Sequence, residues 1–175
     1  MTRWAWPSVA ALALTFIAVL AFHGKRPEPG LARFEPGGLL VGWPAAEMAS
    51  VEITAGGQHR SFERVPRGWR PEAGGEAPPD LTERIERGLQ LLHDSKPERI
   101  FRRDELAGGA LEEFGLTPPR LSVTARTGSG RSITVHFGGP NPLGLARYAQ
   151  VQGEAEVALL SGFVAEAWEQ VAARR

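Results

Sequence analysis

Residues 121–137 read LSVTARTGSGRSITVHF and decide the fold that we expect. Apolar and polar side chains alternate over Leu121–Ala125 and again over Ile133–Phe137, which is the two-residue period of a half-buried strand. The intervening Thr127–Gly130 is rich in turn-forming residues. The stretch therefore predicts a β-hairpin with one apolar face.

Two further parts of the chain show the same alternation. Ser50–Thr54 and His59–Val65 lie on either side of Gly56-Gly57, a pair that suits a tight turn. Ala146–Gln152 and Glu156–Leu160 lie on either side of a Gly-Glu turn. We expect a β-hairpin at each place.

Helical spacing occurs in two longer segments. Asp80 and Glu83 form a capping-box pair at the start of the first. Its apolar stripe is Leu81, Ile85, Leu89 and Leu92. Ser161 precedes the second, the closing helix. The apolar face of that helix is Val164, Ala167, Trp168 and Val171. A shorter helix ends at Phe114, and Arg99–Arg103 is a candidate short strand.

Residues 4–22, WAWPSVAALALTFIAVLAF, follow a short leader (1–3) and contain no charged residue. As one helix they would be about 28 Å long, close to the hydrocarbon thickness of a bilayer. The run therefore predicts a transmembrane anchor. The anchor residues that we expect are Trp4, Trp6, Phe16 and Phe22, with the two tryptophans placed as in an interfacial aromatic belt.

Two alternatives to a retained anchor remain open. The run is also compatible with a secretory signal cleaved after Ala21, or with a buried core helix. Arg3 on one side and Lys25-Arg26 on the other leave the orientation nearly balanced. Because a single N-terminal span usually exports the domain behind it, we expect a single-pass protein of the bacterial inner (cytoplasmic) membrane. Its C-terminal domain would lie in the periplasm or otherwise outside the cytoplasm.

Residues 23–48 are rich in proline and glycine and predict a linker, so the compact domain is expected over 49–175. Leu39–Val41 and Trp43 are large apolar exceptions that we expect to dock onto the domain. The fold class that follows is α+β: an N-terminal transmembrane helix, then antiparallel β-hairpins with two to three helices in the order ββα-ββββα. The similarity of V-x-I-T-A to S-V-T-A in two hairpins suits either a duplicated unit or chance.

The composition excludes several classes of function. The chain has no cysteine, which rules out thiolate metal sites, a redox pair and a cysteine nucleophile. Its 20 basic and 20 acidic residues give a net charge of +0. With no positive surplus, we expect no nucleic-acid partner.

The order of elements resembles that of a known family. The residues that carry the resemblance include Trp69, Tyr148, Phe137-Gly138 and, most specifically, the F-G-L-x-P-P motif at 114–119. The chain resembles, over about 49–171, a bacterial domain-of-unknown-function family that is often encoded beside gliding-motility-type ABC exporters. The family is usually longer, and this chain looks like one compact copy. The resemblance implies a membrane-tethered extracytoplasmic α+β domain that partners a transporter, and it implies no catalytic residues.

The residue types used in catalysis and metal binding do not form a recognisable pattern. The four histidines lack metal-ligand spacing. They are His23, His59, His93 and His136. His59 and Ser61 share a strand face about 7 Å apart, so we expect a solvated strand face instead of a nucleophile and its base. Glu112 and Glu113 point to different sides of a helix. We expect no metal and no cofactor.

Three other features are candidate sites. Gly128–Gly130 lacks the context of a dinucleotide-binding loop and predicts a hairpin turn. Gly138–Gly144 could bring backbone N–H groups close to a ligand, but a rigid turn is the simpler interpretation. Phe163, Val164 and Trp168 suit either a surface for a partner helix or core packing, and we expect core packing.

We therefore expect a non-enzymatic, membrane-anchored auxiliary protein whose domain contacts an ABC-type transporter (permease or ATPase) or another multi-subunit assembly, with membrane lipid as a further partner. One alternative is a small accessory subunit of a larger membrane complex. Another is a binding module for a glycan or small ligand. The candidate ligand or partner surface is Trp69, Tyr148, Asn141 and Trp43.

Overall fold

The computed structural model describes residues 15–17, 37–74, 77–106, 108 and 110–173. The chain divides into two compact units, Met1–Glu35 and Pro36–Arg175. Of the first unit, residues 15–17 are described, as helix, with Phe16 and Ile17 64% and 61% exposed.

The predicted transmembrane anchor is corrected by the structure. Within the described ranges, no helix is both long enough and apolar enough to cross a membrane. The prediction took the apolar composition of residues 4–22 as evidence of one continuous helix, and most of these residues, including Trp4, Trp6 and Phe22, lie outside the described part. The placement as a single-pass protein of the bacterial inner membrane, with a periplasmic domain, depended on that helix and is withdrawn with it.

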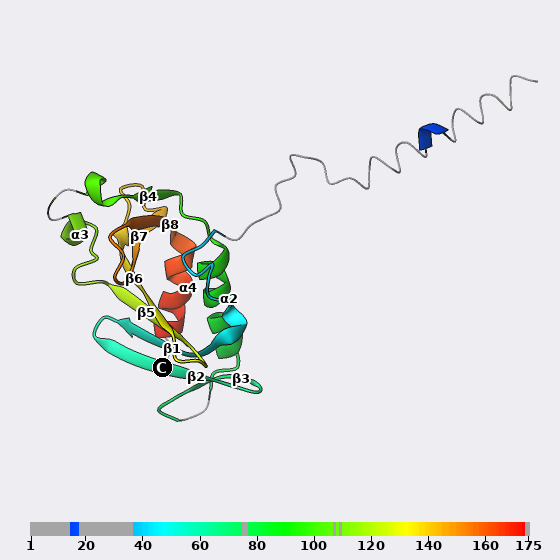
Figure 1. Cartoon of the computed structure of the whole chain (residues 1–175). Coiled ribbons are helices and arrows are strands. Elements are labelled where there is room, and N and C mark those ends of the chain that lie inside the picture. Colours follow the sequence, from blue (N-terminus) through cyan, green and yellow to red (C-terminus); the bar gives the residue numbers. More distant parts are fainter. Residues whose placement is uncertain (1–14, 18–36, 75–76, 107, 109, 174–175) are drawn as a thin grey trace, which may run out of the picture. The chain divides into compact units, whose positions relative to one another are not determined.

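The second unit is built on one antiparallel sheet of eight strands (Figure 1). In chain order these are β1 (Met48–Ala55), β2 (Gln58–Val65), β3 (Gly68–Pro71), β4 (Arg99–Phe101), β5 (Leu121–Thr127), β6 (Ser132–Pro140), β7 (Ala146–Val151) and β8 (Val157–Ser161). Across the sheet the order is β3-β2-β1-β5-β6-β7-β8-β4. Two meanders, β1–β3 and β5–β8, thus meet at the β1–β5 pair, and β4 forms one edge by pairing with β8.

Two long helices, α2 (Leu81–Asp94) and α4 (Gly162–Ala173), lie side by side on one face of the sheet (Figure 1). Each follows one meander in the chain. The short elements are η1 (Ala45–Glu47), η2 (Arg103–Glu105) and α3 (Ala110–Glu113). The core lies between the sheet and the two long helices, because the inward residues of the central strands and the apolar stripes of both helices belong to one buried cluster.

The predicted order of hairpins, ββα-ββββα, is corrected to this single eight-stranded sheet, and the idea of a duplicated unit falls with it because the halves are unequal. The strand that the prediction missed is β3. Glycine and proline at its ends are residues that strands usually avoid. Tertiary contacts stabilise it instead: Trp69 is 2% exposed, and its backbone N–H donates to Thr82 Oγ1 of α2 at 2.9 Å.

Part of the predicted linker belongs to the compact unit. Leu40 is 1% exposed and lies in the core. The N–H groups of Gly38 and Leu40 donate to His93 O and Leu92 O, at 3.0 and 3.1 Å. The segment therefore satisfies two carbonyls at the C-terminal end of α2, which a helix leaves without intrahelical donors. An added Cβ at Gly38 would lie 2.2 Å from Leu92 O, so this close approach requires glycine.

Candidate functional site

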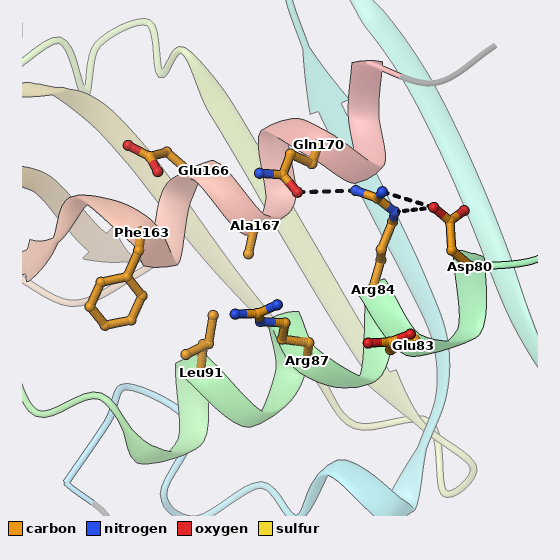
Figure 2. Close-up of a pocket in the computed structure, with 9 residues that line it drawn as sticks. All are labelled: Asp80, Glu83, Arg84, Arg87, Leu91, Phe163, Glu166, Ala167 and Gln170. Carbon is orange, nitrogen blue, oxygen red and sulfur yellow. Dashed lines mark hydrogen bonds and ion pairs between the residues drawn. The ribbon is translucent and has the colours of Figure 1, made fainter.

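A groove of about 420 Å³ runs between the outer sides of α2 and α4 (Figure 2). The two helices run antiparallel, so the start of α2 lies beside the end of α4. One end of the groove is apolar, where Leu91 of α2 faces Phe163 and Ala167 of α4. The other end is polar and includes Asp80, Arg84 and Gln170.

Hydrogen bonds hold the polar end in place (Figure 2). Arg84 donates from Nε to Asp80 Oδ2 at 2.8 Å, and its Nη2 forms an ion pair with the same oxygen at 2.8 Å. Its Nη1 donates to Gln170 Oε1 at 3.0 Å. Because the Arg84 and Asp80 side chains are half-buried and the contact uses two nitrogens, this arrangement is better ordered than an ordinary surface ion pair. Arg84 therefore ties the two helices together.

The apolar end opens onto exposed hydrophobic side chains. Phe163 is 51% exposed, and the neighbouring loop carries Leu143 and Leu145, which are 78% and 71% exposed. The N–H of Gly162 donates to Leu145 O at 2.8 Å, which places the loop beside the first turn of α4. Phe163 lines the groove, whereas Leu143 and Leu145 belong to the loop beside it. Single exposed apolar residues are common, but several on neighbouring segments beside a groove indicate an interaction surface. We call Leu143, Leu145 and Phe163 the apolar mouth.

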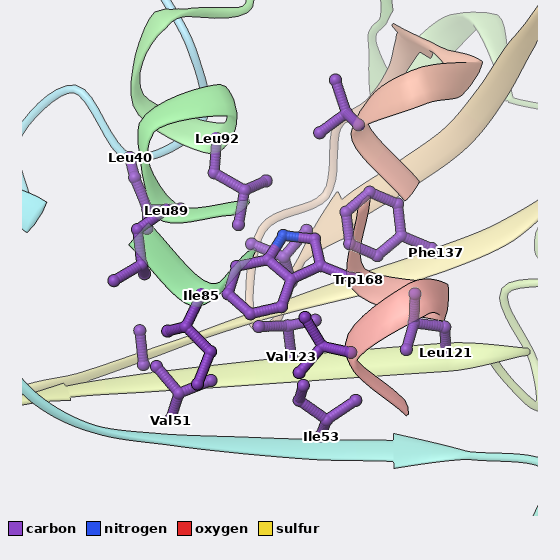
Figure 3. Close-up of a cluster of buried hydrophobic side chains, with 14 of the residues drawn as sticks. Leu40, Val51, Ile53, Ile85, Leu89, Leu92, Leu121, Val123, Phe137 and Trp168 are labelled. Carbon is purple, nitrogen blue, oxygen red and sulfur yellow. The ribbon is translucent and has the colours of Figure 1, made fainter. Parts of the chain in front are cut away.

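The inner sides of the same helices are in close contact beneath the groove (Figure 3). Trp168 is fully buried, with a relative exposure of 0%, among residues of both helices and the sheet. A Cβ at Gly88 would lie 2.7 Å from the indole ring, so only glycine lets α2 approach this closely. The Trp168–Gly88 contact fixes the spacing of the helices, and the groove is therefore preformed. A glycine inside a strong helical pattern was the sequence signal for this contact, and the prediction did not use it.

Of the residues considered together on the last helix, two pack inward and one does not. Val164 and Trp168 are each 0% exposed, as core packing predicts. Phe163 lies at the surface instead. The period of a helix separates them, because adjacent residues point in different directions.

The four residues predicted as a ligand or partner surface do not lie together. Trp69 is buried on the helix-covered face, where its Nε1 donates to Glu86 Oε1 at 2.8 Å. Tyr148 is on β7, which four intervening strands separate from β3, in the part of the sheet nearer the other edge. Trp43 lies under the guanidinium of Arg131, which is 4.6 Å from its ring centroid.

Asn141 shapes a turn. Its Oδ1 accepts hydrogen bonds from the N–H groups of Leu145 and Ala146, at 3.0 and 3.2 Å. Its own N–H donates to Ala146 O at 2.8 Å. Of the predicted turn at Gly138–Gly144, the first three residues belong to β6, and the rest lies in a braced reversal between β6 and β7.

The F-G-L-x-P-P motif also has a structural role here. The ring of Phe114 stacks on Tyr148 with centroids 4.0 Å apart. Gly115 adopts a φ of 68°, a conformation that favours glycine. Phe114 O accepts a hydrogen bond from Gly139 N–H at 2.7 Å, and Leu116 is 4% exposed. The motif therefore fastens the chain before β5 onto the end of β6.

His59 and Ser61 approach each other more closely than the strand spacing predicted. Ser61 Oγ is 3.2 Å from His59 Nε2, and Thr54 Oγ1 is 3.2 Å from His59 Nδ1. The order hydroxyl–imidazole–third group resembles that of a nucleophile and its base. The third group, however, is an uncharged threonine hydroxyl, which cannot stabilise an imidazolium as a carboxylate does. We interpret the three residues as a hydrogen-bonded row on the uncovered face.

The remaining polar groups give no metal centre. His136 is hydrogen-bonded to Ser122 Oγ at 2.9 Å, and burial lowers the pKa of His136. No cluster of three or more histidines, aspartates and glutamates suited to a metal ion occurs in the part of the chain that the structure describes.

Comparison with known proteins identifies no relative of this chain. No family model, no curated protein and no solved structure matches the chain. The resemblance to the transporter-associated family therefore stays a prediction, and the geometry of the groove is the basis for a functional proposal.

Proposed function

We propose that this chain is a non-enzymatic accessory protein that binds another protein through the groove between α2 and α4. The observation that carries the proposal is the exposure of Phe163 at the apolar mouth. Fully burying such a side chain contributes about 1.5–3 kcal/mol. Aromatic residues seated at well-packed interfaces often supply a large share of the binding energy.

The groove suits an amphipathic helix of the partner. Two helices packed side by side leave a furrow that accepts the side-chain ridge of a third, and helix-in-groove binding is a common mode of recognition. An apolar side chain of the partner would fill the space above Ala167, between Leu91 and Phe163. Its polar residues would lie along Arg87 and Glu166, which are exposed on the two facing helices.

The identity of the partner rests on the resemblance alone. A permease or ATPase of an ABC-type exporter is the first candidate to test, and another multi-subunit assembly is the second. The ligand-module alternative receives less support, since Trp69, one of its expected contact residues, is 2% exposed.

Affinity capture of the tagged full-length chain in gentle detergent, from cells that produce it naturally, tests the proposal. The variant is Phe163→Ala, and the matched control is Val41→Ala, because Val41 is likewise 51% exposed but lies in the segment before β1. We expect a stoichiometric partner with the wild type and the control, reduced about tenfold with Phe163→Ala. Equal recovery with Phe163→Ala, or no partner at all, would contradict the proposal. Thermal melting of each variant shows that the domain remains folded.

A further inference from the structure

Strand β2 extends beyond its outer neighbour. β3 pairs with β2 over Phe62–Val65 only. Along Gln58–Ser61, β2 pairs with β1 on its inner side. On its outer side there, the described residues give one hydrogen bond, from Glu72 N–H to Ser61 O at 2.9 Å. A short length of strand edge is therefore available beside the end of β3.

The backbone groups of His59 point toward that edge. Gly56 and Gly57, with φ of 55° and 78°, form a two-residue hairpin turn, so Ala55 and Gln58 are a hydrogen-bonded pair. Because hydrogen-bonding direction alternates along an antiparallel strand, Gln58 and Arg60 face β1 and His59 faces away from it. Ser61 has the same direction as His59, and its carbonyl accepts the outer hydrogen bond from Glu72.

A pocket of about 560 Å³ adjoins this edge. Its apolar floor consists of Phe62, Leu81 and Val171, which are 5%, 5% and 2% exposed. Arg60 lies at its rim and shares the helix-covered face of β2 with Phe62, two residues further along. A strand edge and an apolar pocket thus occur side by side, and the pocket shares none of its described lining residues with the α2–α4 groove.

We propose that the outer edge of β2 at Gln58–Ser61 binds an extended peptide segment of another protein as an added antiparallel strand. The peptide residue opposite His59 exchanges backbone hydrogen bonds with it. The peptide residue opposite Arg60 directs its side chain to the helix-covered face, where an apolar side chain enters the pocket over Leu81 and Val171. A peptide is favoured as occupant because backbone groups give affinity and alternate side-chain pockets give selectivity in this mode of binding. The site is independent of the groove, so either proposal can fail without the other.

The experiment uses random short peptides displayed on phage and selected against the full-length chain. A selected peptide is synthesised in its natural form and with an N-methyl group on each internal amide in turn. Affinities are measured by fluorescence polarisation, and backbone amide exchange of the protein is measured with and without peptide. Ala73→Trp, at an exposed residue lining the pocket, fills it; Ala155→Trp, at an exposed turn residue between β7 and β8, is the matched control.

We expect the selected peptides to share one apolar position and to slow amide exchange at His59. One N-methyl position should weaken binding by about tenfold, because it removes a backbone donor. Ala73→Trp should weaken binding to a similar extent, and Ala155→Trp should not. The proposal is overturned if no peptide is selected, if the protected amides lie elsewhere, or if every N-methylated peptide binds as well as the natural one.

Discussion

The sheet has one face that α2 and α4 cover and one that they leave open. Alternate residues of the same strands form these two faces. On the covered face, Val51, Ile53 and Val123 are 0–1% exposed. On the open face, their neighbours Glu52 and Thr124 are half-buried and polar. The strand period of two places each kind of residue on its own side.

The open face is held together by cross-strand polar pairs. Thr124 and Thr134 are hydrogen-bonded at 2.9 Å, and Ser122 and His136 at 2.9 Å. Hydrogen bonds of this kind contribute little to the net free energy of unfolding, since water competes for the same groups. The covered face gains from burial instead, which is larger and depends on shape. We therefore expect substitutions on the covered face to change the free energy of unfolding more than substitutions on the open face.

The largest effect is expected from Trp168→Ala on the covered side. Removing this side chain should lower the free energy of unfolding by about 3–5 kcal/mol, through lost burial and the cavity left behind. Urea denaturation measures it. Trp168→Phe is the control and should cost less, because the smaller ring fills much of the space. It also removes an indole N–H that is buried without an acceptor in the part of the chain described. A loss below about 1 kcal/mol for Trp168→Ala would mean that this side chain is not central to the core.

Gly88→Ala should come next. Alanine is favoured over glycine in a helix by about 1 kcal/mol. Here the added methyl group would meet the indole at 2.7 Å, so we expect a net destabilisation of about 1–3 kcal/mol. The same change in a Trp168→Leu background should be much less costly or stabilising. A double-mutant cycle in urea measures the coupling, and additive effects would contradict the contact.

His136, on the open face, should make the stability of the domain depend on pH. Burial lowers its pKa below the usual 6.5, so the folded state disfavours the proton that the unfolded state accepts. The stability is therefore fully present above pH 6.5 and falls as the pH drops from there toward the folded-state pKa. Unfolding free energies measured across this window should show the fall in the wild type and a flatter profile in His136→Gln. Identical slopes would show that another group is responsible.

The smallest effect is expected from the pair Thr124→Val and Thr134→Val. Each single change leaves the partner hydroxyl without its hydrogen bond and should cost about 0.5–1.5 kcal/mol. The double variant should cost less than the sum, because both groups of the pair become apolar together. Denaturation midpoints of the three variants make the comparison. A double variant as costly as the sum would mean that the two hydroxyls do not interact.

The sequence was most informative where the pattern is local. Alternation identified the hairpins that became β1–β2, β5–β6 and β7–β8, and the apolar stripe and Asp80 located α2. Strand β3 was not predicted, because glycine and proline weaken its local sequence pattern. Trp69 stabilises the strand through tertiary packing instead. The β1–β5 pairing was not predicted, because local sequence does not show which strands of distant hairpins become neighbours in the sheet.

The candidate site was harder to predict than the core. The groove is made by residues of two helices from opposite halves of the chain, and its formation depends on the fit of Trp168 to Gly88. Phe163 differs from its buried neighbour Val164 only in the direction in which the helix turns it. The transmembrane anchor was predicted from the apolar composition of residues 4–22, and most of these residues lie outside the described part of the chain.

The central β1–β5 pairing has a consequence for synthesis and folding. When the ribosome has released β1–β4 but not β5–β8, β1 is paired with β2 but lacks its second neighbour β5, and β4 lacks β8. Closing these distant contacts requires a long loop, which slows folding. The nascent first half would therefore present an unpaired strand edge until the second half emerges, and it is in this interval that we expect the chain to be most prone to aggregation.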